Sequence, residues 1–600
     1  MRSDQSGSPS SRTRSALTRR ALLATSGVAA AAFAGRTLAQ DASTTIAGNA
    51  TPAASPVAES AATPSPFGNL TVVRDVQPTY PDQPVEGGEL RLMLTAGDNL
   101  DFHPAAFAQD FQVMVSYLDP LIRINETTLE PEPWLAESWT WSDDGTEITY
   151  VLREDVRWHD GKRLAAKDVA FSLTVYRDDV LSSVRNLFTS MRSVEAVDDR
   201  TVKVTLNGPD GGWIRNASSQ LIVQREQYIA YWEDRPEGQR SLSGYTWAER
   251  KPIGTGPWIV GERGDRKIEL ARNDEYWAGP AHAERLTLTW NEDPARRLRD
   301  WKRGSVDLAW PVDGTQLDTV SDVPGALHLS PSLTVMFAAF NFDNPIRPTP
   351  SLLSDLRIRE AISLAIDRER YAADVFGGLF DPVRAGGFPQ PPFADAGAVN
   401  PARDVGAARA LIAEAGFEER DDHLENDAGD RLGLDVIVSQ AADPALIATL
   451  VLLQEDLRDV GMTLEIRRLS PERFENVWVD EHGFDLIAFS FDQYPGFTDF
   501  DLYGSAWDIR TNIQGFNPGG YRNEAVDRAI DQALVAPDDD ALKEAVAIIQ
   551  RETTTDLFAV WLGQPLEAVL VRPEIGGFVP NLLWQTWDTR KLWRRSDPPT

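Results

Sequence analysis

Apolar residues recur at every second position in several short segments of the chain. The first is the run Leu90, Leu92 and Leu94. The same spacing returns in residues 148–152, 202–206 and 286–290. A period of two is typical of a strand with one buried face, so these four segments are predicted to be β-strands.

Other segments carry apolar residues at the 3.6-residue spacing of a helix. Residues 358–366 follow this spacing behind Asp355, whose side chain is suited to cap a helix N-terminus. Residues 452–460 follow it too and stop before Gly461, a residue suited to the position after a helix end. A strand pattern, 463–469, comes next. Because strands and helices mix along the whole chain, the predicted class is α/β or α+β.

The stretch "GTEITYVLREDVRWHDGKRLAAKDVAFSL", residues 145–173, contains adjacent His159 and Asp160. They could form a catalytic or metal-binding pair, or they could only shape a turn. Asp160 and Gly161 form a turn signal, because glycine accepts positive φ without a steric penalty. A strand precedes them and a helical pattern begins at Ala166, so we interpret His159 and Asp160 as turn residues.

The chain has 600 residues, of which 42% are hydrophobic, and no cysteine. That length predicts two to four domains or subdomains. Net charge is −32, and the first 39 residues carry +5, so subtraction leaves −37 for the rest. Such an acidic body repels phosphate backbones, which argues against a nucleic-acid partner. The absence of cysteine excludes disulfides, thiol nucleophiles and cysteine–zinc sites.

The N-terminal region is typical of an export signal. Arg19 and Arg20 precede a weakly apolar run, 21–35, and a small-residue cleavage site ends at Ala39. The pattern resembles a twin-arginine signal; the alternative is an uncleaved N-terminal anchor. Residues 40–85 begin with an Ala/Ser/Thr/Pro-rich stretch and are predicted to be a flexible spacer. Both a cleaved export signal and an uncleaved anchor would place the body outside the cytoplasmic membrane.

Sequence motifs for catalysis and cofactors are missing. There is no GxxxxGK[ST], GxSxG or HExxH pattern. The Gly254-Thr255-Gly256 run is interrupted by Pro257, so it is not a dinucleotide loop. The six histidines are far apart in sequence, so only the folded chain could gather them into a metal site. We therefore predict no cofactor and no metal; a pair of acid/base carboxylates can be neither picked out nor excluded.

Several segments together resemble one known family. "LAESWTWSDDGTEITYVLREDVRWHDGKRLAAKDVAFSL", from Leu135, is similar to the signature of the extracellular solute-binding proteins of family 5, which are receptors of ABC importers. Further similar segments, spread over about 86–590 on both sides of this one, stand in the family's order. They are "GELRLMLTAGDNLDFHPA", "PIGTGPWIV", "ARNDEYWAGPAHAERLTL", "GSVDLA", "LRIREAISLAIDRERY" and "ARALIAEAGF".

The resemblance implies an α/β fold of the periplasmic-binding-protein kind (type II, cluster C), in which two lobes close over a ligand. It implies a discontinuous first lobe at 86–121, 246–336 and 560–597. A small subdomain, 122–245, is inserted in it, and the second lobe is 337–559.

The resemblance also selects ligand-binding candidates. "FDLIAFSFDQYPGFTDFD" is similar to a family segment in which an aspartate pairs with a peptide amine, and Asp492 falls on that position. Phe491 and Tyr494 would provide stacking walls. Trp310, after "GSVDLA", and Asp110 are further candidates. The alternatives are that Asp492 caps a loop and that the aromatic residues belong to the core.

The implied function is the extracytoplasmic substrate-binding protein of an ABC importer. It would be a monomer that captures a peptide or other small polar solute and delivers it to permease subunits, behind which the ATPase subunits act. It would not be an enzyme, and it would meet the membrane only through the permease or an uncleaved leader. Two alternatives remain: a secreted polysaccharide-active hydrolase, suggested by 18 tryptophans and 91 carboxylates, and a sensory or scaffold relative without transport.

Overall fold

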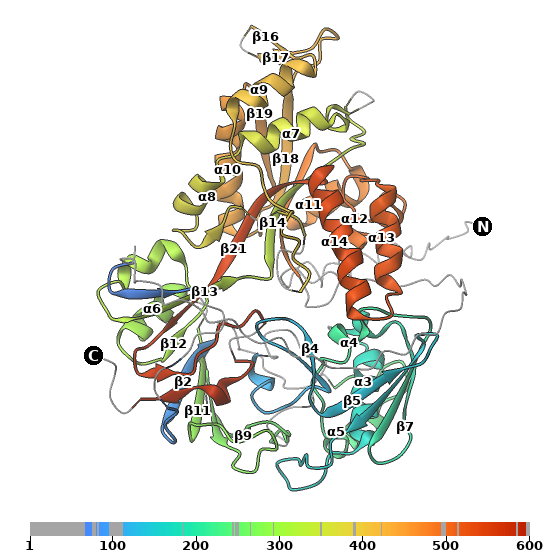
Figure 1. The fold of residues 1–600 in the computed structure, drawn as a ribbon, viewed down its shortest axis with the longest axis vertical. Helices are drawn as coiled ribbons and strands as arrows, with labels where there is room; N and C mark the ends of the chain where they lie inside the picture. Colours follow the sequence, from blue (N-terminus) through green and yellow to red (C-terminus); the bar gives the residue numbers. More distant parts are fainter. Residues whose placement is uncertain are drawn as a thin grey trace, which may run out of the picture. The chain divides into compact units, whose positions relative to one another are not determined.

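The computed structural model describes most of the chain after residue 66, and its residues form two compact units. Unit 1 comprises Pro331–Ala533 and Asp540–Pro565, and unit 2 comprises the described residues before Pro331 together with Leu534–Asp539 and those after Pro565 (Figure 1). The described residues are 67–74, 80, 83–94, 112–182, 184–242, 245, 251–264, 266–291, 293–347, 351–383, 385–387, 392–421, 423–493, 500–512, 515–583 and 586–595.

Unit 2 contains a mixed sheet built around β2. Strand β2 lies parallel to β11 on one side and to β12 on the other, and β12 pairs with the second half of β21. Helix α6 (Pro294–Lys302) links β11 to β12, and the Asp293 carboxylate caps its first turn. The strands are β1 (Leu70–Val73), β2 (Glu89–Leu94), β9 (Trp258–Gly264), β10 (Lys267–Arg272), β11 (Arg285–Trp290), β12 (Leu308–Ala309), β13 (Gly325–Pro331) and β21 (Ala559–Val571).

A second sheet in unit 2 is four-stranded and antiparallel, in the order β5-β6-β8-β7. Helix α3 packs against β7, β8 and α5. Unit 2 also contains two small antiparallel strand pairs, β3–β4 and β22–β23. The elements are β3 (Ile122–Ile124), β4 (Pro131–Pro133), β5 (Ala136–Trp141), β6 (Glu147–Leu152), α3 (Ala166–Asp178), β7 (Met191–Ala196), β8 (Thr201–Leu206), α4 (Trp213–Asn216), α5 (Arg225–Glu233), β22 (Ile575–Gly576) and β23 (Trp593–Arg594).

Unit 1 contains a sheet in the order β19-β18-β20-β14, followed by the first half of β21. Strands β18 and β19 are parallel, whereas β14 is antiparallel to both β20 and β21. Helix α10 packs on β19 and β20, and α7 packs on α9 and α10. The strands are β14 (Thr334–Phe340), β15 (Phe380–Asp381), β16 (Glu418–Arg420), β17 (His423–Glu425), β18 (Gly433–Ser439), β19 (Thr463–Leu469) and β20 (Leu486–Asp492).

The helices of unit 1 are α7 (Leu356–Ala365), α8 (Arg368–Asp374), α9 (Val405–Glu414), α10 (Pro444–Asp459), α11 (Pro471–Asn476), α12 (Phe500–Tyr503), α13 (Glu524–Leu534) and α14 (Asp539–Thr555). Short helical turns lie at Arg185–Phe188, Gly314–Thr319, Leu352–Ser354, Val477–Glu481, Ser505–Trp507 and Thr589–Lys591. None of the described helices has both the length and the apolar character needed to cross a bilayer.

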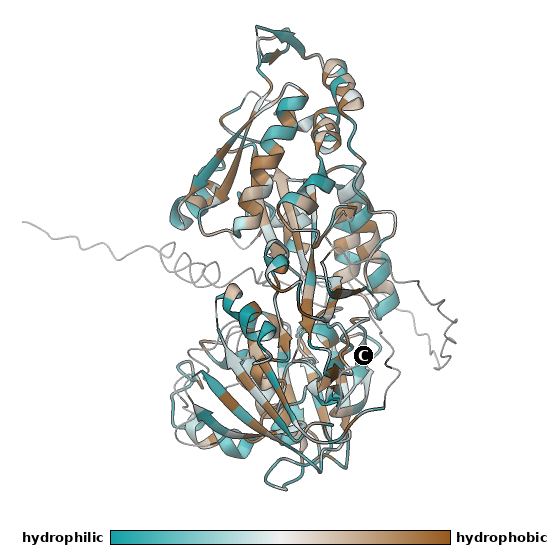
Figure 2. Cartoon of the chain, turned by 90° about the vertical axis from the view of Figure 1, so that its left-hand side faces the viewer, coloured by the Kyte–Doolittle hydropathy of each residue, from teal (hydrophilic) through white to brown (hydrophobic). Residues whose placement is uncertain are grey.

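Each unit has its own hydrophobic core. The core of unit 2 lies between its sheets and helices, and the core of unit 1 lies between its sheet and α7, α9 and α10. Figure 2 shows hydrophobic residues along the strands, whereas the β16–β17 hairpin is mainly hydrophilic. The chain therefore buries apolar surface separately in each unit, as its length predicts.

The structure confirms the strands and helices predicted from periodicity. Leu90, Leu92 and Leu94 are buried in β2, and the other three alternating segments are β6, β8 and β11. The Asp355 side chain accepts a hydrogen bond from the first turn of α7. Gly461 follows the end of α10 with φ of 83°, the left-handed conformation expected of a glycine after a helix end.

Candidate ligand-binding site

The unit 1 candidates lie at the end of strand β20. Strand β20 pairs with β14 so that Phe491 faces Val335 and Asp492 faces Thr334 in the register. Phe491 is 9% exposed, so most of its ring is packed inside the unit. The backbone of Asp492 closes the strand. Phe491 and Asp492 are therefore the last two residues of a strand.

Three predicted contacts lie outside the described part of the structure. The side chain of Asp492 is one, and Tyr494 and Asp110 are the other two. Their roles therefore stay predictions that rest on the sequence.

Trp310 is the predicted contact from unit 2, directly after β12. Its ring is partly buried and packs against the core of the unit. Its indole nitrogen is buried and has no hydrogen-bond partner among the residues described. Trp290 and Trp301 share this feature, so it does not single out Trp310 as a ligand contact. Its role stays a prediction that rests on the sequence.

Asp119 forms a carboxylate centre in unit 2 that the sequence analysis did not identify. Its oxygens accept hydrogen bonds from the Trp134 indole at 2.9 Å and from the hydroxyls of Thr255 and Tyr276 at 2.8 Å. The Trp277 indole donates a fourth bond at 3.3 Å. The side chain is buried among these donors, which offset its loss of water. The sequence pattern could have indicated this residue, because Asp119 interrupts an otherwise apolar run.

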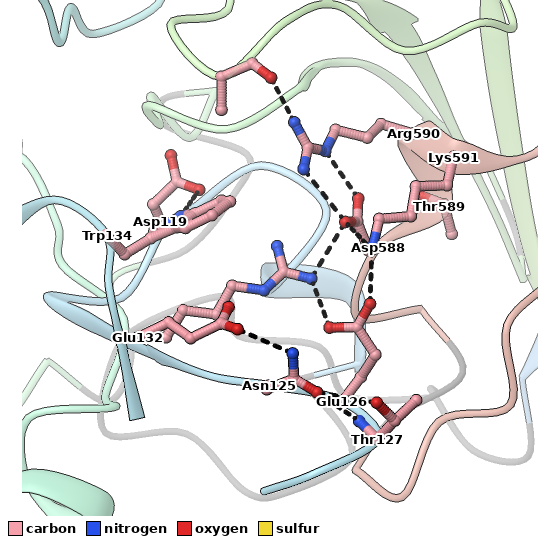
Figure 3. A network of polar contacts seen from close by, with 12 residues as sticks. Asp119, Asn125, Glu126, Thr127, Glu132, Trp134, Asp588, Thr589, Arg590 and Lys591 are labelled. Carbon is pink, nitrogen blue, oxygen red and sulfur yellow. Dashed lines mark hydrogen bonds and ion pairs between the residues drawn. The ribbon is translucent and has the colours of Figure 1, made fainter. Parts of the chain in front are cut away.

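A second polar cluster joins the β3–β4 region to the C-terminal segment (Figure 3). Arg123 donates to both Glu126 and Asp588 at 3.1 Å, and Lys591 bonds Glu126 at 2.6 Å. Arg590 also donates to Asp588, at 2.9 Å. Burial opposes ionisation of Asp588, but Arg123 and Arg590 outweigh it and lower its pKa to about 2. The carboxylate is therefore charged at neutral pH.

Trp134 links the two clusters. Its indole nitrogen donates to Asp119, and the Arg123 guanidinium lies 4.5 Å from its ring centre. Segments 119–134, 255–277 and 588–591 are thus held together by buried charges that already have partners. Such charges fix chain segments, and none of them is left as an unpaired acid, base or nucleophile for chemistry on a substrate.

His159 and Asp160 shape a turn, as predicted. The Nδ1 atom of His159 accepts from the Gly254 backbone N–H, and Nε2 lies 2.9 Å from the Gly256 carbonyl. Burial lowers the pKa of His159, so the neutral ring suits both bonds. Asp160 accepts from the backbone N–H of Lys162. Two signature segments far apart in sequence therefore pack on each other.

Among the described residues, no three His, Asp or Glu side chains are grouped so that they could hold a metal ion.

A profile match identifies the family that the sequence motifs indicate. The profile of the bacterial extracellular solute-binding proteins, family 5 middle, matches residues 130–511. The chain belongs to this family. The match covers the second half of β3–β4, the antiparallel sheet and most of unit 1, so the predicted resemblance is confirmed.

Two relatives represent the sequence similarity. A Brucella ovis protein named as an ABC transporter peptide-binding protein is 25% identical over 449 residues, which cover 72% of this chain and 79% of the relative. The peptide transport periplasmic protein SapA of Salmonella typhimurium is 27% identical over 371 residues, which cover 58% of this chain and 63% of that protein.

Solved structures of similar fold include two binding proteins. The oligopeptide-binding protein AppA from Bacillus subtilis, in complex with a nonapeptide, has a TM-score of 0.61 and 20% identity over 86% of this chain and all of its own. NikA from Brucella suis, in complex with Fe(III)-EDTA, has a TM-score of 0.68 and 22% identity over 85% of this chain and all of its own. These similarities confirm the predicted fold class.

Proposed function

We propose that this chain is the extracytoplasmic substrate-binding protein of an ABC importer. It captures a peptide or another small polar solute and delivers it to a membrane permease. The observation that carries the proposal is the family match over residues 130–511. The names of relatives in Brucella and Salmonella, which refer to peptide binding and peptide transport, support it.

Ligand specificity rests on individual residues, because one fold can serve many ligands. We assign Asp492 to the ligand amine and Phe491 and Tyr494 to the walls around it. Trp310 and Asp110 are assigned as contacts from unit 2. A carboxylate facing an ammonium group in a site shielded from water provides a strong and directional contact. A peptide or another amine-bearing solute therefore suits these residues best.

Capture does not require a chemical step. The polar clusters around Asp119 and Asp588 are paired within unit 2, so they hold the fold rather than act on substrate. Ligand contacts then stabilise one conformation over another, and release leaves the solute intact. No observation favours the hydrolase or scaffold alternatives.

Localisation and partners follow from the same proposal. The twin-arginine-like leader, residues 1–39, exports the chain. The predicted spacer at 40–85 ends earlier than residue 85, because Leu70–Val73 form strand β1 and pair with β13 of unit 2. The protein acts as a monomer and meets permease subunits, with ATPase subunits behind them.

A ligand screen tests the proposal. The purified protein is heated with a panel of di- to nonapeptides and, separately, with a panel of oligosaccharides, and the midpoint of unfolding is measured. A binding peptide raises the midpoint because it binds the folded state only. Mass spectrometry of the same samples must find the peptide uncleaved. Stabilisation by glycans together with glycan products would instead support the hydrolase.

A further inference from the structure

A pocket lies in the antiparallel-sheet region of unit 2, between helices α3 and α5. It has a volume of about 300 Å³. Its lining comes from one stripe of each helix, because residues 167, 170, 171 and 174 share a face of α3 and residues 225, 229, 232 and 233 share a face of α5. Ala196, at the end of β7, adds a further wall.

The floor of the pocket is apolar. Phe171 is 6% exposed and Trp232 is 3% exposed, and their rings meet edge to face with centroids 6.3 Å apart. Ala170 and Ala196 are small, and Ile229 is only partly buried. Aromatic rings with small neighbours leave room for a flat or slender apolar group.

The rim of the pocket is cationic. Lys167, Arg225 and Arg240 line it, against one acid, Glu233. Arg240 donates only to the Arg235 carbonyl, at 3.3 Å, and its guanidinium lies 5.9 Å from the Trp232 ring centre. Within the described residues, no carboxylate forms an ion pair with any of the three cations.

Three unpaired cations around one pocket stand out in a chain with a net charge of −32. In the polar clusters of unit 2, by contrast, Arg123 and Arg590 each contact carboxylates. Cations that only interact with water at the surface would not require an apolar pocket floor beneath them. Apolar floor and positive rim together match a ligand with an apolar body and an anionic head.

We propose that this pocket binds a small amphiphilic anion, with its apolar body on Phe171 and Trp232 and its carboxylate or phosphate head on Arg225 and Arg240. The volume is at the lower end of the range for ligand pockets, roughly 300–1,000 Å³. One aryl ring or a short acyl chain therefore fits better than a whole lipid. The site is separate from Asp492, which belongs to unit 1.

Calorimetric titration at low ionic strength tests the proposal with octanoate as the probe. Octanoate is expected to bind saturably at one site. Octanamide, which has the tail without the charge, and acetate, which has the charge without the tail, are expected to bind at least tenfold more weakly. The double variant Arg225→Gln/Arg240→Gln is expected to weaken octanoate binding at least tenfold. Equal binding of octanoate and octanamide would overturn the anionic head.

Matched variants separate this site from general charge effects. Arg528→Gln removes a cation from an exposed position on α13 of unit 1 and is expected to leave octanoate binding unchanged. Asp492→Asn is expected to leave it unchanged as well, which distinguishes the pocket from the proposed solute site. Thermal unfolding checks that each variant is folded. Octanoate binding that survives the double variant, or binding only to phosphatidylglycerol vesicles, would overturn the assignment to a free small molecule.

Discussion

At the scale of single residues, buried charges in this protein are explained by their neighbours. Asp119 has four donors, and Asp588 lies between Arg123 and Arg590. Each contact offsets the cost of removing a charge from water. Asp492 ends β20 as the predicted partner of a ligand amine. Pairing with a cation is thus expected to stabilise the fold at Asp588 and to bind the ligand at Asp492.

Replacing Asp492 tests the ligand contact. Asp492→Ala is expected to weaken binding of the tightest peptide from the screen by roughly 2–5 kcal/mol, because the ammonium group would lose its partner. Asp492→Asn, which keeps the size of the side chain, should weaken it in the same direction. Calorimetric titration measures both. Asp427→Asn, in an exposed turn after β17, serves as control. Unchanged affinity in Asp492→Ala would remove this residue from the site.

The lowered pKa of Asp588 predicts that the free energy of unfolding decreases as the pH falls. The ordinary value is 3.8 and the folded value is about 2, so the folded state favours the ionised carboxylate. Its contribution, about 2 kcal/mol, is complete above pH 4 and is lost as pH falls toward 2. Urea unfolding of the wild type and Asp588→Asn at pH 5 to 2.5 measures it. The free energy of unfolding should fall more steeply in the wild type; parallel curves would contradict this.

At the scale of elements, periodicity in the sequence was enough to locate β2, β6, β8, β11 and α7, because each buries one regular face. The partners of Asp119 could not be found in this way. Thr255 and Tyr276 are 136 and 157 residues away from it, and only the folded chain brings them together. Trp310 was identified by family resemblance, while its unmatched indole nitrogen became visible only in the structure.

Two glycines test how closely Gly254 packs against the backbone of Tyr117. A Cβ atom at Gly254 would lie 1.6 Å from the Tyr117 carbonyl oxygen, whereas one at Gly161, with φ of 82°, would meet open space. Gly161→Ala is therefore expected to lose only about 1–2 kcal/mol, from the left-handed backbone. Gly254→Ala should lose clearly more, because the backbone must shift. Urea unfolding compares the two; similar losses would contradict this account of the contact.

At the scale of the whole molecule, the family match and the two units describe a solute-binding protein. The motifs allowed the family to be predicted, because several weak segments followed in the right order. The position of the domain boundaries, the monomeric state, and the export signal with its cleavage stay predictions. A ligand could not be named from sequence, since it depends on a few side chains on one shared fold.

Substitution of the arginine pair tests whether the N-terminal region is a twin-arginine signal. Substituting both Arg19 and Arg20 with lysine is expected to block export, because twin-arginine transport reads the arginine pair itself. Cell fractionation of the producing bacterium should then find the protein inside the cytoplasm. As control, replacing Arg12 and Arg14 with lysine keeps the charge and leaves the pair intact, so export should continue. Normal export of the Arg19/Arg20 variant would contradict a twin-arginine signal.

Native mass spectrometry of the protein purified from its own host shows whether the chain is a binding protein. We expect a monomer that carries one small solute. After prolonged incubation with the protein, the solute released on denaturation should have an unchanged mass. A chain that turns the recovered solute into product, or that never holds any solute or peptide, would contradict this expectation.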